Sequence, residues 1–221
     1  MKWLLIVLAL VIVGCTDPCA KSDTQDSCYL KQAVEAKSAN SCERLSSVML
    51  QTSCYTDVAI AKGNTEPCTR ISDERSAGFC MAQVAVATKD TDLCTAVTHG
   101  PAQDKCRFQL GQAVLDASLC SGITAEDYAD TCSYNVALNV SSAQACSYIH
   151  SKDQRNKCYT YVASARDDPS ICKQITTFEM VHWCTANIAM KRLDKELCES
   201  IEDGSVRGAC TYGINLRLNQ T

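Results

Sequence analysis

The chain has few of the large side chains that could fill a deep hydrophobic core. Its 221 residues include only three Phe and two Trp, and one of the tryptophans, Trp3, lies in an apolar N-terminal run. The sequence also lacks a Gly-rich phosphate loop, a nucleophile elbow and a paired-carboxylate motif. No two cysteines have the two-residue spacing typical of zinc ribbons, redox motifs or haem attachment. We therefore expect thin cores, no enzymatic activity, no metal and no cofactor.

The charge balance is mildly negative. The chain has 21 Lys and Arg residues against 25 Asp and Glu residues, a formal net charge of −4 at pH 7. Nucleic acids and anionic lipid headgroups attract basic surfaces. The sequence therefore predicts that neither is a partner.

The N-terminus carries a short apolar run. Residues 3–13 are apolar and follow Lys2, and eleven residues form a helix of about 16 Å, roughly half of a bilayer core. Such a run is typical of the apolar region of a signal peptide, so we expect residues 1–14 to be one. The alternative is an uncleaved anchor that simply buries Cys15.

Residues 12–15, Ile-Val-Gly-Cys, resemble the lipobox of prokaryotic lipoproteins. In that motif the cysteine receives a lipid and becomes the mature N-terminus. The resemblance implies a lipid anchor on Cys15 that holds the protein to a membrane. The location it implies is the cell envelope, at the outer side of the cytoplasmic membrane or at the outer membrane.

Fifteen of the seventeen cysteines follow a fixed spacing. From Cys28 to Cys210 the intervals alternate between fourteen and twelve residues, which defines a 26-residue repeat. An insertion in any unit would break this phase, so each unit is expected to be one rigid block stacked on the next, as in a solenoid. We predict a lipid anchor and tether over residues 15–27 and a repeat domain over residues 28–221.

Each unit is predicted to contain a long and a short helix. We number a unit from the first cysteine of its long helix, such as Cys54, as position 0. Apolar residues recur at +4 and small residues at +5, with frequent alanine at +7, and this stripe predicts a helix of about sixteen residues. The residues at +4 are Val58, Val84, Leu110, Val136, Val162, Ile188 and Ile214; those at +5 are Ala59, Ala85, Gly111, Ala137, Ala163 and Ala189; the alanines at +7 are Ala61, Ala87, Ala113 and Ala165.

A capping residue marks the change to the short helix. Position +10 is Asn, Asp or Ser, residue types that accept hydrogen bonds from the free N–H groups of a new helix. A helix of about seven residues is expected to follow, with cysteine at +14 and Leu or a β-branched residue at +17. The predicted fold is an all-α solenoid of 26-residue disulfide-bridged helical hairpins. It is similar in concept to the cysteine-bridged, tetratricopeptide-related repeats of secreted bacterial proteins, although their period is longer.

Two pairings of the cysteines are possible, across the twelve-residue or the fourteen-residue gaps. If Cys15 carries lipid, sixteen cysteines remain, and the fourteen-residue pairing would leave Cys19 and Cys210 unpaired at opposite ends. The twelve-residue pairing uses every cysteine and fastens each short helix to the next long one, so we favour it. Its pairs are Cys19 with Cys28, Cys42 with Cys54, Cys68 with Cys80, Cys94 with Cys106, Cys120 with Cys132, Cys146 with Cys158, Cys172 with Cys184 and Cys198 with Cys210.

Tyrosines are the candidate binding residues. Tyr55 and Tyr159 lie at +1, Tyr134 at +2 and Tyr161 at +3 of their units. Tyrosine is a frequent contact anchor in interfaces, although these four could instead cover the alanine stripe and the disulfides. The histidines, His99, His150 and His182, occupy different repeat positions and so predict no repeated histidine site.

Solenoids present long surfaces of the kind that bind proteins or peptides. The sequence therefore favours a non-catalytic, envelope-anchored binding protein whose protein or peptide partner is unknown. A structural spacer of the envelope is the alternative, and an enzyme or redox protein is a weaker one.

Overall fold

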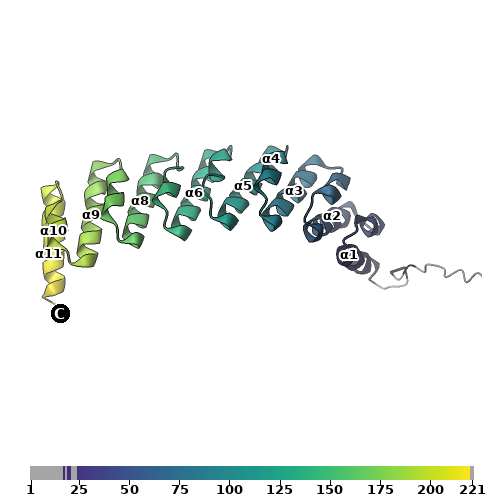
Figure 1. Cartoon of the computed structure of the whole chain (residues 1–221), viewed down its shortest axis with the longest axis horizontal. Coiled ribbons are helices and arrows are strands. Elements are labelled where there is room, and N and C mark those ends of the chain that lie inside the picture. The colour runs from purple at the N-terminus through teal and green to yellow at the C-terminus, as the bar shows by residue number, and fades with distance from the viewer. Residues whose placement is uncertain (1–16, 18, 21–23, 220–221) are drawn as a thin grey trace, which may run out of the picture.

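The protein is a curved rod of stacked helical hairpins in the computed structural model (Figure 1). The structure describes residues 17, 19–20 and 24–219, so the predicted signal peptide and Cys15 lie outside it. Regular secondary structure in the described part is entirely helical, which confirms the predicted all-α solenoid. None of the described helices is both long and apolar enough to cross a membrane.

Long and short elements alternate along the rod. The long helices are α1 (Gln25–Glu35), α2 (Val48–Lys62), α3 (Glu74–Thr88), α5 (Gly100–Val114), α6 (Glu126–Val140), α8 (Lys152–Arg166), α9 (Phe178–Arg192) and α11 (Gly204–Leu218). The short elements are the α-helices α4 (Thr91–Ala96), α7 (Ala143–Cys146) and α10 (Lys195–Glu199), and the 3-10 helices η1 (Ala39–Arg44), η2 (Glu66–Arg70), η3 (Cys120–Gly122) and η4 (Pro169–Gln174). From α2 onward each long helix has 15 residues and begins 26 residues after the previous one.

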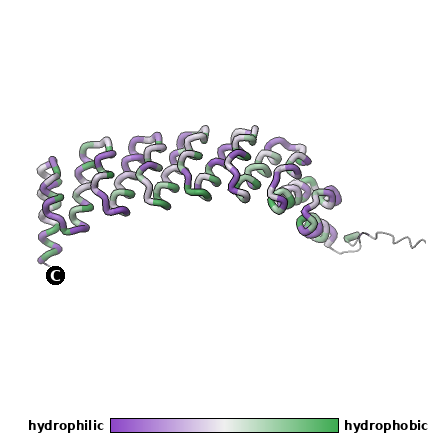
Figure 2. Tube along the Cα trace, viewed as in Figure 1, coloured by the Kyte–Doolittle hydropathy of each residue, from purple (hydrophilic) through white to green (hydrophobic). Residues whose placement is uncertain are grey.

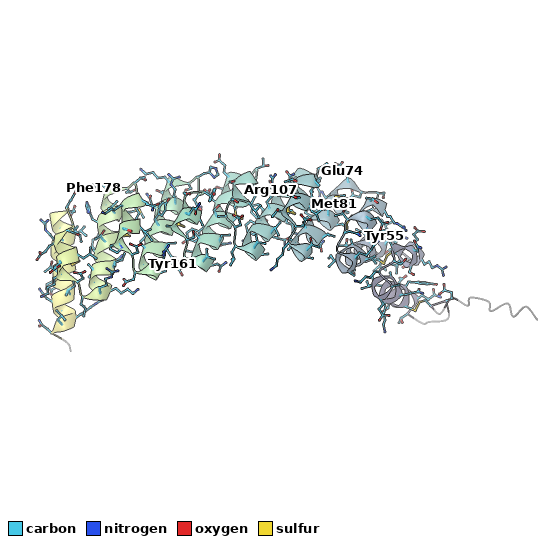
Figure 3. The ribbon with its side chains drawn as sticks, viewed as in Figure 1. Tyr55, Glu74, Met81, Arg107, Tyr161 and Phe178 are labelled. Carbon is cyan, nitrogen blue, oxygen red and sulfur yellow. A yellow bond between two sulfur atoms is a disulfide. The ribbon has the colours of Figure 1, made fainter. Side chains whose placement is uncertain are left out.

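The long helices cross the rod from its convex edge to its concave edge (Figure 1). Glu74 and Phe178, the first residues of α3 and α9, lie at the convex edge, whereas Tyr161, late in α8, lies at the concave edge (Figure 3). The short elements lead the chain back to the convex edge. There, at positions +17 to +19, it turns into the next long helix, and we name this turn the corner of the unit.

The core is thin and local, as predicted. The side chains at +4 and +5, such as Val58 and Ala59, are fully buried, and the buried residues form separate clusters along the rod. Hydrophobic residues occur in every unit and are not gathered at one place (Figure 2). The alanines at +7 are a correction: Ala87, Ala113 and Ala165 are exposed. At about 100° per residue the buried face is centred on +1, +4 and +5, and +7 lies at its edge in the last turn.

Eight disulfides join the cysteines across the twelve-residue gaps and pair Cys19 with Cys28. Each of the other seven fastens a short element to the following long helix, and their Cα–Cα distances are 5.6–5.8 Å. The folded region begins before the predicted boundary at residue 28. Cys19 is buried, and the Asp17 carboxylate accepts a hydrogen bond from the Tyr29 hydroxyl at 2.8 Å and pairs with Arg44.

The turn at the concave edge has a left-handed residue at +9 after every long helix except the last, α11, where Asn219 is right-handed. Only Gly63 among the left-handed residues is a glycine; the others are Lys37, Lys89, Leu115, Ser141, Asp167 and Leu193. From Asn64 onward the next residue caps the short element, as predicted: Asp168, for example, accepts from the Ser170 N–H at 3.0 Å. Ser38, in the first unit, makes no side-chain cap. The short elements are shorter than the predicted seven residues, because +17 is extended in most units and inserts its side chain into the core.

Candidate functional site

Four units close their corner with a polar side chain from the long helix. Position −2, two residues before the cysteine, is Asp26, Asp104, Asp130 or Asn156, and its side-chain oxygen accepts the backbone N–H at +18 of the same unit. The donor–acceptor distances are 2.6–3.2 Å. The bond satisfies a corner N–H that no helical carbonyl reaches, and so it fixes the start of the next long helix.

Asp130 makes the most extensive of these corner contacts. It is almost fully buried and accepts from the N–H groups of His150 and Ser151 at 2.6 and 2.8 Å, with the His150 Nδ1 at 3.0 Å. Burial alone would raise the pKa of Asp130, but these hydrogen bonds outweigh it, and the pKa lies below its ordinary value. His150 is therefore part of a corner cap. His99 is also a cap, because its Nδ1 accepts from the Ala102 N–H at 3.3 Å.

His182 occupies the same −2 column but makes no such bond. The side chain is 6% exposed, and its Nε2 atom is shielded from solvent without a hydrogen-bond partner in the described part of the chain. The ring of Phe178, one turn earlier, packs edge-on against the imidazole, with 4.4 Å between the two ring centroids. Phe178 itself is 63% exposed. A buried polar atom without a partner carries a desolvation cost, so it marks a place where a partner group could bind.

A groove of about 600 Å³ opens beside His182, between α9, η4 and the corner after α10. Val181, Leu197 and Ile201 supply apolar walls, and Lys173 and Glu202 supply charged groups of opposite sign. The remaining lining residues are Pro169, Ser170, Thr185 and Ser200. This volume falls in the range of small-ligand and side-chain pockets.

The groove exists because two facing columns both carry small residues here. Side chains at +1 and +16 contact each other in two other units. Arg44 stacks on Tyr29, with 5.7 Å from its guanidinium carbon to the ring centroid. Arg107 packs against Gly122 and donates a hydrogen bond to its carbonyl. Tyr55 and Arg70 line a small pocket of about 50 Å³. The pairs along the rod are Tyr29 and Arg44, Tyr55 and Arg70, Met81 and Ala96, Arg107 and Gly122, Ser133 and Tyr148, Tyr159 and Gln174, and Thr185 and Ser200. Only the last pair lacks a large side chain.

The four predicted tyrosines do not form one exposed surface. Tyr55 and Tyr159 are 7% and 5% exposed, and burial raises the pKa of both phenols. Tyr134 is partly buried against the central core, and Tyr161 alone is half exposed, at the concave edge (Figure 3). Tyr55 and Tyr159 therefore cover the core, which was the alternative interpretation of these residues.

Comparisons of the chain with protein-family models, with curated proteins and with solved structures find no match. Among the residues that the structure describes, no group of three or more His, Cys, Asp or Glu side chains is placed to hold a metal ion. The groove at His182 is therefore characterised only by the residues that line it. Its sequence signal lies in the columns at −2, +1 and +16 and not in any local motif.

Proposed function

We propose that the protein is a non-catalytic solenoid that binds a protein or peptide partner and is held in the cell envelope by a lipid on Cys15. The observation that carries the proposal is the exposure of large apolar side chains on the rod. Val48 and Met49 at the start of α2, and Phe178 and Trp183 in α9, are between 41% and 77% exposed. Met and aromatic residues are enriched in protein interfaces, so their exposure favours a macromolecular partner.

The regular backbone supports the same conclusion. A disulfide and a buried +17 side chain in each unit hold the long helices in register, so the exposed side chains are presented on a fixed frame. A pre-organised surface loses little conformational entropy on binding. The envelope location rests on the lipobox resemblance of residues 12–15, which lie outside the described part of the chain.

Affinity capture tests the proposal. Oxidised protein lacking residues 1–16 is immobilised and exposed to detergent-solubilised envelope of the source organism, and retained proteins are identified by mass spectrometry. The matched variants replace apolar residues with serine at one edge each: Val48, Met49 and Phe178 at the helix starts, or Leu115 and Val140 at the helix ends. We expect a specific protein on the wild-type rod and its loss in one of the two variants. Failure to retain any protein above bare resin, with all eight disulfides verified, contradicts the proposal.

A structural spacer is the alternative function. The observation that favours it is the covalent bridge in every unit, since repeated crosslinks stiffen a rod whether or not it binds a partner. A spacer predicts high copy number or self-association. Sedimentation velocity of the oxidised protein separates the two functions, because a binding protein is expected to remain monomeric until its partner is added.

A further inference from the structure

We propose that the groove at His182 binds a tyrosine side chain presented by the partner protein. The inference rests on the proposed function and deepens it by naming the contact chemistry. Three observations carry it: the groove between α9 and the following corner, the lining residue His182 with its unpartnered imidazole nitrogen, and the side chains that occupy the same columns in other units.

The solenoid itself indicates what fits the groove. At +1, other units carry Tyr55 and Tyr159, which are packed into the rod with 7% and 5% exposure, and at +16 one unit carries Tyr148. In the groove unit these columns hold Thr185 and Ser200, so no side chain from the described residues fills the space. A tyrosine supplied by another protein would restore the packing that the other units make internally. The volume of about 600 Å³ leaves additional room for the backbone beside such a ring.

The chemistry of the lining favours a phenol over a plain aromatic ring. Val181, Leu197 and Ile201 offer apolar surface to a ring, and the His182 Nε2 lacks a hydrogen-bond partner. A hydroxyl can donate to the imidazole nitrogen or accept from it, whichever tautomer is present. A phenylalanine ring would bury the same surface but leave the nitrogen unpaired, and the missing hydrogen bond would weaken its binding.

The lining gives no net preference for a charged ligand. Lys173 and Glu202 both line the groove, so an anionic or a cationic group would each meet one like and one opposite charge. In addition, the imidazole is the only lining group that is both buried and without a partner among the described residues. A neutral ring with one hydroxyl matches this arrangement best.

The test uses p-cresol, the side chain of tyrosine, and toluene, that of phenylalanine, as probes. Each is titrated into oxidised, isotope-labelled protein and followed by amide chemical shifts in two-dimensional NMR spectra. We expect p-cresol to shift the amides of Thr185, Ser200 and Ile201. We expect it to bind about 2- to 10-fold more tightly than toluene, the ratio that one net hydrogen bond provides.

Two variants distinguish the groove from general hydrophobic binding. Ser200→Tyr introduces the residue found at 148 in the same column and should abolish the shifts, whereas Ala96→Tyr, which introduces tyrosine at +16 of another unit, should leave them intact. His182→Asn introduces the residue found at 156 and should reduce the preference for p-cresol over toluene to less than 2-fold. Each variant is first checked for eight disulfides and for wild-type helical content by circular dichroism.

Three results would overturn the inference: shifts that map away from the groove, equal affinity for the two probes in the wild type, or unchanged p-cresol binding by Ser200→Tyr. Because the probes report on the groove alone, such a result with partner capture still intact rejects the tyrosine site and leaves the binding function standing. Conversely, if p-cresol binds in the groove but no partner protein is captured, the tyrosine-sized site is supported and the proposed binding function is rejected.

Discussion

Reduction of the disulfides should unfold the rod. Each of the seven repeat bridges closes a loop with a sequence separation of twelve residues, and a loop of this size is worth about 3 kcal/mol in the chain-entropy model. The loops do not overlap in sequence, so in that model their contributions add to roughly 20 kcal/mol. Folded domains are typically stable by only about 5–15 kcal/mol, so the crosslinks exceed the expected net stability.

The assay is a urea titration monitored by far-ultraviolet circular dichroism, with and without a phosphine reductant. Reductant is added at a urea concentration that exposes the sulfurs, because the bridging cysteines are almost completely buried, and the protein is then returned to buffer. We expect the oxidised rod to be helical and the reduced chain to have lost most of its helical signal. A reduced chain that regains full helicity and unfolds at nearly the same urea concentration would refute the reasoning.

One bridge can be removed to calibrate the magnitude. The double variant Cys120→Ala, Cys132→Ala opens the loop between η3 and α6. Both sulfurs pack 3.3–3.4 Å from where a side chain on Gly111 would begin, so their removal also leaves a small void beneath the preceding helix. We expect a loss of about 3 kcal/mol or slightly more. Hydrogen exchange should rise mainly in the two adjoining units, because repeats contact only their neighbours.

Three further predictions follow from single positions. The lowered pKa of Asp130 means that its contribution to stability is complete above the ordinary carboxyl pKa of 3.8 and is lost as pH falls through the folded-state pKa. Asp130→Asn should keep the corner cap but remove this acid dependence. Thermal unfolding between pH 2 and 7 measures the difference. Leu193 has a φ of 58°, so Leu193→Gly should stabilise the rod by about 1 kcal/mol in urea unfolding, whereas the helical control Ala87→Gly should destabilise it by a similar amount. Cys15→Ser should release the protein from the membrane fraction and remove the mass of the lipid, and unchanged fractionation would argue against the anchor.

The cysteine spacing was sufficient to predict the solenoid because covalent geometry tolerates little variation. A bridge at a fixed separation sets the distance between a short element and the next helix, and the +4 and +5 columns then identify the face that is buried. The residues at +10 predicted where the long helix stops and the short element starts, because the free N–H groups at a helix N-terminus need a hydrogen-bond acceptor. These features are local in sequence and recur in every internal unit.

The parts that sequence could not predict depend on contacts between distant positions. The exposure of Ala87 follows from its place at the edge of the buried face in the last turn of α3, and the early start of the fold follows from the contacts of Asp17 with Tyr29 and Arg44. The groove at His182 is similar: Thr185 and Ser200 are unremarkable in isolation and matter only as the one facing pair without a large side chain. A histidine in a column of capping residues was the visible signal, but its meaning required the corner geometry.

The crosslinks and the groove are physically connected. In a solenoid held together by side-chain packing alone, replacing a tyrosine or arginine filler with Thr185 and Ser200 would cost several kcal/mol of burial and destabilise the unit. Here the bridges Cys172–Cys184 and Cys198–Cys210 and the buried Ile201 hold that unit in place independently of the filler. A repeat whose stability is covalent can therefore leave one position empty without unfolding. The disulfides, which make up for the shortage of large side chains in the thin core, are thus the property that allows one unit to present an open groove.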